Sequence, residues 1–95
     1  KHQMKITPEH YAFIKDAIQN KFTVSLVNDH RTFIENEWKR DGVKYEKENV
    51  EKRLRWDLLW LSVKSDWICA NIYKYADNTH IDTALKKIVK ELEFN

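Results

Sequence analysis

Apolar residues recur at helical spacing in the N-terminal part of the chain. At 100° per residue, four apolar positions between residues 8 and 22 share one face: Tyr11, Ile14, Ile18 and Phe22. Thr7 can cap such a helix, and Pro8 suits its first turn because the missing N–H has no partner there. We therefore predict a first helix over residues 8–21.

The next apolar stripe predicts a second helix over residues 24–40. Its inward positions are Val27, Ile34 and Trp38. Asn28 and Asp29 offer a later cap, and with it a shorter helix, as an alternative start. Gly42 is the only glycine, and we expect it to end this helix because glycine readily adopts the left-handed conformation found after helix C-termini. The charged residues 43–48 are predicted to form a loop.

The stretch 49–63 is apolar on two opposed faces of one predicted helix. One stripe contains Val50, Leu54, Leu58 and Leu61, and the other contains Trp56, Leu59, Trp60 and Val63. Such a helix is either central to its domain, with both faces covered, or it lends its second face to a partner. The pattern alone leaves both alternatives open.

Two further helices are predicted in the C-terminal part. The first covers residues 66–76, with Ile68, Ile72 and Tyr75 on its core face and Trp67 projecting away from that face. The second begins near Thr79, which forms a capping-box pattern with Asp82 three residues later. Its inward positions are Ile81, Leu85, Ile88 and Leu92.

These elements predict an all-α protein, a single compact bundle of four to five short helices over residues 4–95. One glycine and one proline leave few residues for the tight turns that an all-β fold needs. Hydrophobic residues make up 42% of the 95 positions, enough for a core without disulfides or a structural metal. Residues 1–3 precede Met4, and we expect them to be the remnant of an expression tag.

Cysteine content indicates a reducing compartment. Cys69 is the only cysteine, so it forms no intramolecular disulfide and no Cys-based zinc site. We see no signal-peptide pattern, and no apolar run is long enough to span a bilayer. The expectation is a cytoplasmic protein without a membrane partner.

Three short segments resemble small helical proteins of unassigned activity carried by bacteriophages and prophages. They are RWDLLW at 55–60, SDW at 65–67 and YADNTHIDTALKKIV at 75–89, in the C-terminal third to half of the chain. The resemblance implies a phage-type accessory protein in the cytoplasm of a bacterial host, an adaptor or inhibitor that binds a host or phage factor. It implies no activity, cofactor or site residue.

No pattern indicates an enzyme, a cofactor or a metal site. No two histidines lie at the i, i+3 or i+4 spacing of a helical metal site. We expect His10, His30 and His80 to be half-buried and bonded to neighbours instead. The single glycine argues against most nucleotide-binding loops, because backbone must approach phosphate closely there. We therefore predict a non-catalytic protein without a cofactor.

The tryptophans give the strongest indication of function. Tryptophan buries a large apolar area while keeping one polar donor, so it is enriched at binding hot spots. We predict a protein-binding surface of aromatic rings with basic residues at the rim: Arg53, Arg55, Trp56, Trp60, Lys64 and Trp67. The partner is another protein or a second copy of the chain. The prediction requires exposed rings, and the pattern equally allows them to be core.

Nucleic-acid binding is the alternative function. It would use basic residues of two helices: Lys52, Arg53, Arg55, Lys86, Lys87 and Lys90. Asp57 lies four residues after Arg53, and Asp82 four before Lys86, so part of this charge is locally neutralised. The net charge of +2 is also small for a dedicated DNA-binding domain, which places this alternative second.

Overall fold

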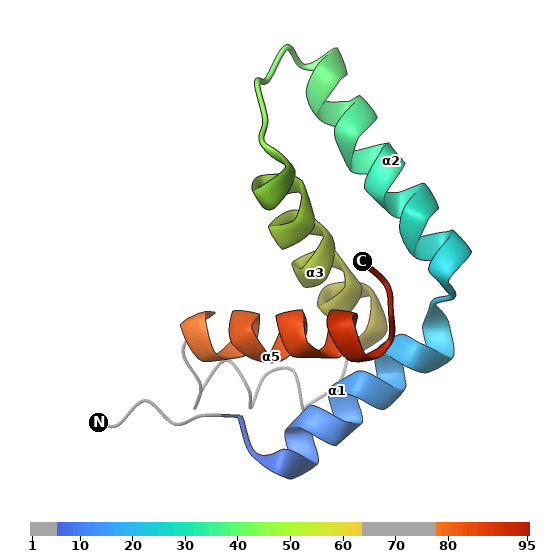
Figure 1. The fold of residues 1–95 in the computed structure, drawn as a ribbon, viewed down its shortest axis with the longest axis vertical. Coiled ribbons are helices and arrows are strands. Elements are labelled where there is room, and N and C mark those ends of the chain that lie inside the picture. The colour runs from blue at the N-terminus through green and yellow to red at the C-terminus, as the bar shows by residue number, and fades with distance from the viewer. Residues whose placement is uncertain (1–5, 64–77) are drawn as a thin grey trace.

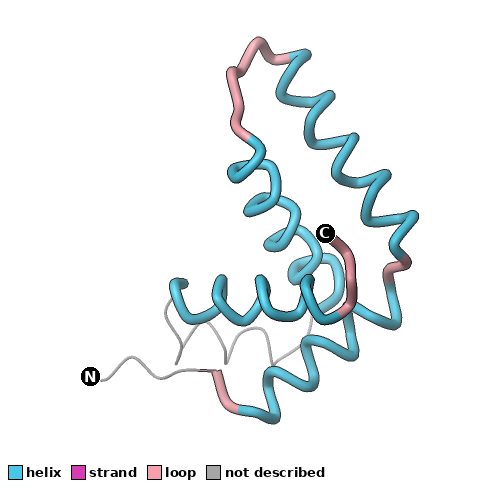
Figure 2. The backbone as a smooth tube through the Cα atoms, in the orientation of Figure 1, coloured by secondary structure: helices cyan, strands magenta, loops and turns pink. Residues whose placement is uncertain are grey.

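Four helices make up the part of the chain that the computed structural model describes, residues 6–63 and 78–95. They are α1 (Pro8–Lys21), α2 (Val24–Arg40), α3 (Lys47–Val63) and α5 (Asn78–Glu91), and these ranges contain no strand (Figures 1 and 2). The all-α prediction is confirmed for them. The helix predicted over 66–76 lies outside the described residues.

Threonine caps fix the starts of the first two helices. Thr7 Oγ1 accepts a hydrogen bond from the amide of His10 at 3.1 Å, and Thr23 Oγ1 accepts one from Leu26 at 3.1 Å. Both caps satisfy an amide that has no partner within the helix, a contribution of about 1 kcal/mol each. The prediction for α1 is confirmed, and α2 begins at Val24 rather than at the later cap offered by Asn28 and Asp29.

Gly42 ends α2 as predicted. Its φ is +73°, a left-handed conformation that strains any residue with a Cβ. Its amide donates to the carbonyl of Lys39 at 3.0 Å, and the amide of Val43 donates to that of Trp38 at 2.9 Å. This pair of bonds is a Schellman motif, which satisfies two carbonyls at the helix end.

The last two described helices begin slightly before the predicted positions. α3 starts at Lys47 instead of residue 49, and α5 starts at Asn78, which places Thr79 inside the first turn. The capping box predicted for Thr79 and Asp82 is wrong. The Asp82 carboxylate accepts hydrogen bonds from side chains of α3 instead.

α3 is the central helix of the described structure. The closely packed helix pairs, α1–α3, α2–α3 and α3–α5, all include it. In Figure 1, α2 and α3 form a hairpin, with α5 and α1 crossing its lower end. Leu58 and Leu59 point in different directions from α3, and both are fully buried. α3 is therefore central, but its faces are not fully covered, because Trp60 is 44% exposed and Leu61 is 37% exposed.

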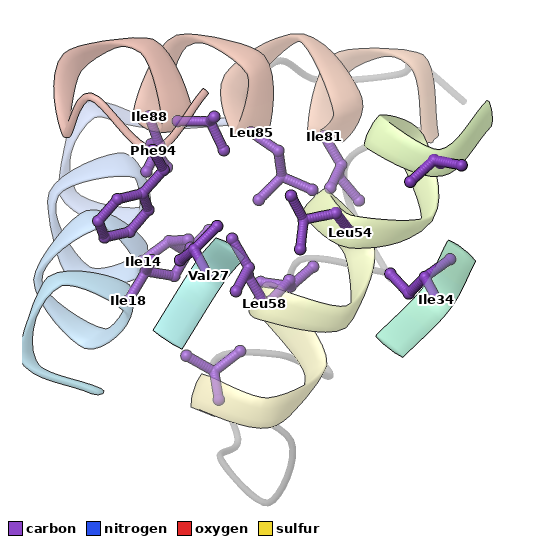
Figure 3. Close-up of a cluster of buried hydrophobic side chains, with 14 residues drawn as sticks. Ile14, Ile18, Val27, Ile34, Leu54, Leu58, Ile81, Leu85, Ile88 and Phe94 are labelled. Atoms are coloured by element: carbon purple, nitrogen blue, oxygen red, sulfur yellow. The ribbon is translucent and has the colours of Figure 1, made fainter. Parts of the chain in front are cut away.

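The core contains apolar side chains from all four helices and from the C-terminal segment. Figure 3 shows several of them pointing into one interior: Ile14, Ile18, Val27, Ile34, Leu54, Leu58, Ile81, Leu85, Ile88 and Phe94. Leu61, predicted for the same stripe as Leu54 and Leu58, is 37% exposed and lies outside this core. Trp38 packs half-buried against its edge, with its ring 5.6 Å from that of Tyr45.

Candidate functional site

Arg55 and Trp56 join α3 to α5 through one carboxylate. The Arg55 side chain is only 7% exposed, and its Nε and Nη2 donate to Asp82 Oδ1 and Oδ2 at 3.1 Å each. Trp56 Nε1 donates to Asp82 Oδ1 at 3.2 Å. A buried guanidinium requires such a partner, because water no longer solvates its charge. These two predicted partner-binding residues therefore hold α5 against α3.

Arg53 lies on a different side of α3, facing α2. Its Nη2 donates to Glu37 Oε1 at 3.1 Å, and its Nε donates to Asp57 Oδ2 at 3.2 Å. Asp57 also bonds His30 Nε2 at 2.9 Å. As residue numbers rise from His30 to Glu37 along α2, they fall from Asp57 to Arg53 along α3, so the two helices are antiparallel. These pairs form a polar seam along one edge of the hairpin.

A second ion pair closes the other edge of the hairpin. Arg31 Nε donates to Glu51 Oε2 at 2.6 Å, and its Nη2 donates to Glu51 Oε1 at 3.1 Å and to the carbonyl of Phe94 at 2.7 Å. Adjacent helix positions differ by about 100°, so Arg31 points well away from His30. The hairpin therefore has two distinct polar edges.

Three large apolar side chains lie beside the His30–Asp57 pair. Leu26 and Phe33, four residues before and three after His30, are 49% and 55% exposed. Trp60, three residues after Asp57, is 44% exposed. Residues three or four apart share a helix face, so all three lie along the polar seam. We call Leu26, Phe33 and Trp60 together with Arg53 the seam surface.

The α2 part of the seam surface has a defined shape. The His30 ring stacks on Phe33 with centroids 5.7 Å apart, and His30 is half-buried and bonded, as predicted. A shallow hollow of about 420 Å³ lies over this helix face and the end of α1, lined by Lys21, Phe22, Leu26, Asp29, His30 and Phe33. The surface thus offers a concave apolar area with a polar edge.

The predicted partner-binding residues are therefore separated in space. Trp60 and Arg53 belong to the seam surface, whereas Arg55 and Trp56 bond Asp82 of α5. Lys64 and Trp67 lie outside the described residues. The sequence interpretation missed Leu26 and Phe33, although their spacing around His30, at i−4 and i+3, marks a second apolar stripe on α2.

The basic residues of the nucleic-acid alternative are also divided. Lys52, Lys86 and Lys90 line two hollows beside α5. Lys87 lies on another side of α5, where its Nζ is 5.4 Å from the centre of the Tyr11 ring. Arg53 and Arg55 are bonded to carboxylates, as described above.

Tyr11 links α1 to α5 at a separate site. Its hydroxyl donates to Glu91 Oε1 at 2.5 Å, and Lys15 Nζ lies 3.1 Å from the same oxygen. Burial and then this hydrogen bond raise the pKa of Tyr11 from 10.0 to about 12. The hydrogen bonds from Tyr11 and Lys15 lower the pKa of Glu91 below 4.5. The two shifts describe a contact that stabilises neutral tyrosine beside ionised glutamate.

Metal ligands do not gather in residues 6–63 and 78–95. Those ranges contain no group of three or more His, Cys, Asp or Glu residues that could hold a metal ion. Their helices are also too short or too polar to cross a bilayer. Cys69 lies outside the described residues.

The comparisons with known proteins add no relative. The chain matches no protein-family model, no curated protein and no solved structure.

Proposed function

We propose that the protein is a non-catalytic accessory protein that binds a protein partner through the seam surface. The supporting observation is the exposure of Trp60 beside Leu26 and Phe33. Single exposed apolar residues are ordinary, but three large ones within about a turn of one polar pair form a patch. Burial of exposed apolar side chains that include a tryptophan is a common source of binding energy.

The partner surface that fits is apolar at its centre with an acceptor at its edge. Trp60, Leu26 and Phe33 would contact apolar side chains. Arg53 donates through Nε and Nη2, and no hydrogen bond of its Nη1 occurs within the described residues. Nη1 is therefore available for a carboxylate or carbonyl of the partner. The resemblance to phage-carried proteins agrees with an adaptor or inhibitor role and names no partner.

The test compares Trp60→Ala with Phe13→Ala, which removes an exposed aromatic ring of α1 outside the seam surface. Light scattering on a size-exclusion column measures self-association, and quantitative capture from bacterial lysate measures association with other proteins. We expect the wild type and Phe13→Ala to retain the same complex. Trp60→Ala should lose it, by at least about 30-fold in affinity if Trp60 is a hot spot worth 2 kcal/mol.

Circular dichroism decides whether a loss of binding is specific. Trp60→Ala should keep the helical spectrum, because the ring is nearly half exposed. A second variant, Leu26→Ser with Phe33→Ser, should lose the same complex without involving α3. If Trp60→Ala and the double variant both retained the complex, the seam surface would be ruled out as the binding site. The same conclusion would follow if Phe13→Ala lost as much affinity as Trp60→Ala.

A further inference from the structure

Two hollows meet at Lys86 of α5. The first, of about 650 Å³, lies between α2, α3 and α5 at the Arg31–Glu51 edge of the hairpin. The second, of about 490 Å³, lies between α3 and the first turns of α5. Lys86 lines both hollows, so they adjoin. We call their basic lining the lysine groove, defined by Lys47, Lys52, Lys86 and Lys90.

The charge of the lysine groove is available to a ligand. Its acidic residues Glu51 and Asp82 are bonded to Arg31 and Arg55. Within the described residues no carboxylate pairs with Lys47, Lys52 or Lys90, whereas Lys86 forms a long ion pair with Asp82 at 4.0 Å. Glu48 and Asn95 also line the first hollow. Four lysines therefore face one carboxylate side chain that no arginine neutralises.

An aromatic ring lies on the wall of the second hollow. The bond from Trp56 Nε1 to Asp82 fixes this ring near Lys52 and Lys86. Lysines that follow a phosphate backbone, next to a ring on which a base stacks, are the usual elements of single-strand binding. The positive end of the α5 dipole at Asn78 and Thr79 adds to the attraction for phosphate.

We propose that the lysine groove binds single-stranded nucleic acid, with phosphates beside Lys47, Lys86 and Lys90 and a base near Trp56. A flexible strand can enter a concave groove that crosses two helices. Duplex readers instead present a protruding basic helix to the major groove, which this arrangement does not resemble. The site is separate from the seam surface, so either can exist without the other.

Fluorescence anisotropy with a labelled oligothymidylate of about 15 nucleotides tests the groove. If three to four phosphates are neutralised, log affinity should fall with log salt concentration with a slope of about −2 to −3. Lys86→Gln, in the residue that lines both hollows, should weaken binding about 3- to 10-fold and reduce the slope by about 0.7. Lys39→Gln on α2 removes the same charge from a residue that lines neither hollow, and it should leave affinity within about twofold.

Three results would contradict binding of single-stranded nucleic acid by the lysine groove. They are no binding at low salt, an equal loss for Lys39→Gln and Lys86→Gln, and equal affinity for a duplex of the same length. Lys90→Gln provides a second variant, since Lys90 forms no ion pair within the described residues and its loss should not disturb folding. Trp60→Ala should bind the strand like the wild type, which separates failure of the groove from failure of the seam surface.

Discussion

Arg53 and Arg55 lie two residues apart on α3, yet they belong to different regions of the molecule. Arg53 pairs with Glu37 and Asp57 at the polar seam, where its side chain is 36% exposed. Arg55 pairs with Asp82 at the α3–α5 junction, where its side chain is 7% exposed. The geometries are similar, with donor–acceptor distances of 3.1 to 3.2 Å. The two pairs differ in their exposure to solvent, which screens the charges of the Arg53 pairs much more than those of the Arg55 pair.

The comparison teaches that similar ion pairs differ in what they contribute. At the seam, water stabilises each charge if its partner is removed. At the junction, removal of one partner leaves a charge that neither water nor another side chain can solvate fully. The junction should therefore be sensitive to single substitutions, and the seam should tolerate them.

The largest expected effect is the loss of Arg55. Among the described residues, Arg55→Ala leaves Asp82 with the Trp56 donor and with Lys86 at 4.0 Å, and we expect a loss of about 3 kcal/mol in the free energy of unfolding. Chemical denaturation followed by circular dichroism measures it. The double variant Arg55→Met with Asp82→Leu should recover much of the stability, because no charge is left unpaired. A loss below about 1 kcal/mol for Arg55→Ala would show that solvent screens the junction as well as the seam.

A smaller effect is expected for Arg53→Ala. Exposed ion pairs typically contribute about 0.2–1 kcal/mol each, and Asp57 keeps its bond to His30. The difference from the wild type should shrink as salt concentration rises, since added ions screen the exposed charges. The same denaturation experiment at low and high salt measures both values. If Arg53→Ala proved as destabilising as Arg55→Ala, exposure would not be what separates the two regions.

The smallest effect is expected at the Tyr11–Glu91 contact, where the Glu91 side chain is 36% exposed, as that of Arg53 is. The raised pKa of Tyr11 means that its contribution to stability is complete below pH 10.0 and lost as pH rises toward 12. The lowered pKa of Glu91 means that its contribution is present above pH 4.5 and lost as pH falls below that value. Thermal unfolding of Tyr11→Phe across this range should show a constant, small deficit near neutrality that narrows at both extremes. A deficit independent of pH would indicate that the hydroxyl acts by packing alone.

Local patterns were sufficient to predict most of the helices. The cap by Thr7 and the stop at Gly42 each involve residues within one turn, so their spacing in the sequence determines their geometry. The same holds for the i, i+4 pair of Arg53 and Asp57. The boundaries of α3 and α5 shifted by one or two residues, which is the range over which helix ends vary.

The pairing of helices could not be predicted in this way. Arg55 and Asp82 are 27 positions apart, and no local spacing relates them. Trp56 and Trp60 lie on one stripe, yet Trp56 is half-buried and bonded to α5 whereas Trp60 is exposed. Which ring is covered depends on where α5 crosses α3, a tertiary property. The partners of Asp82, Arg55 and Trp56, belong to another helix. Local spacing therefore could not identify them, and it indicated a capping box with Thr79 instead.

The position of α3 in the chain also determines when α1 and α2 can pack during translation. Every closely packed pair of described helices includes α3, and its residues follow those of α1 and α2 on the ribosome. When α1 and α2 emerge, the helix against which both pack most closely has therefore not yet been synthesised. Their apolar faces, including Ile14, Ile18 and Ile34, stay accessible to chaperones until translation has passed Val63 and α3 has left the exit tunnel.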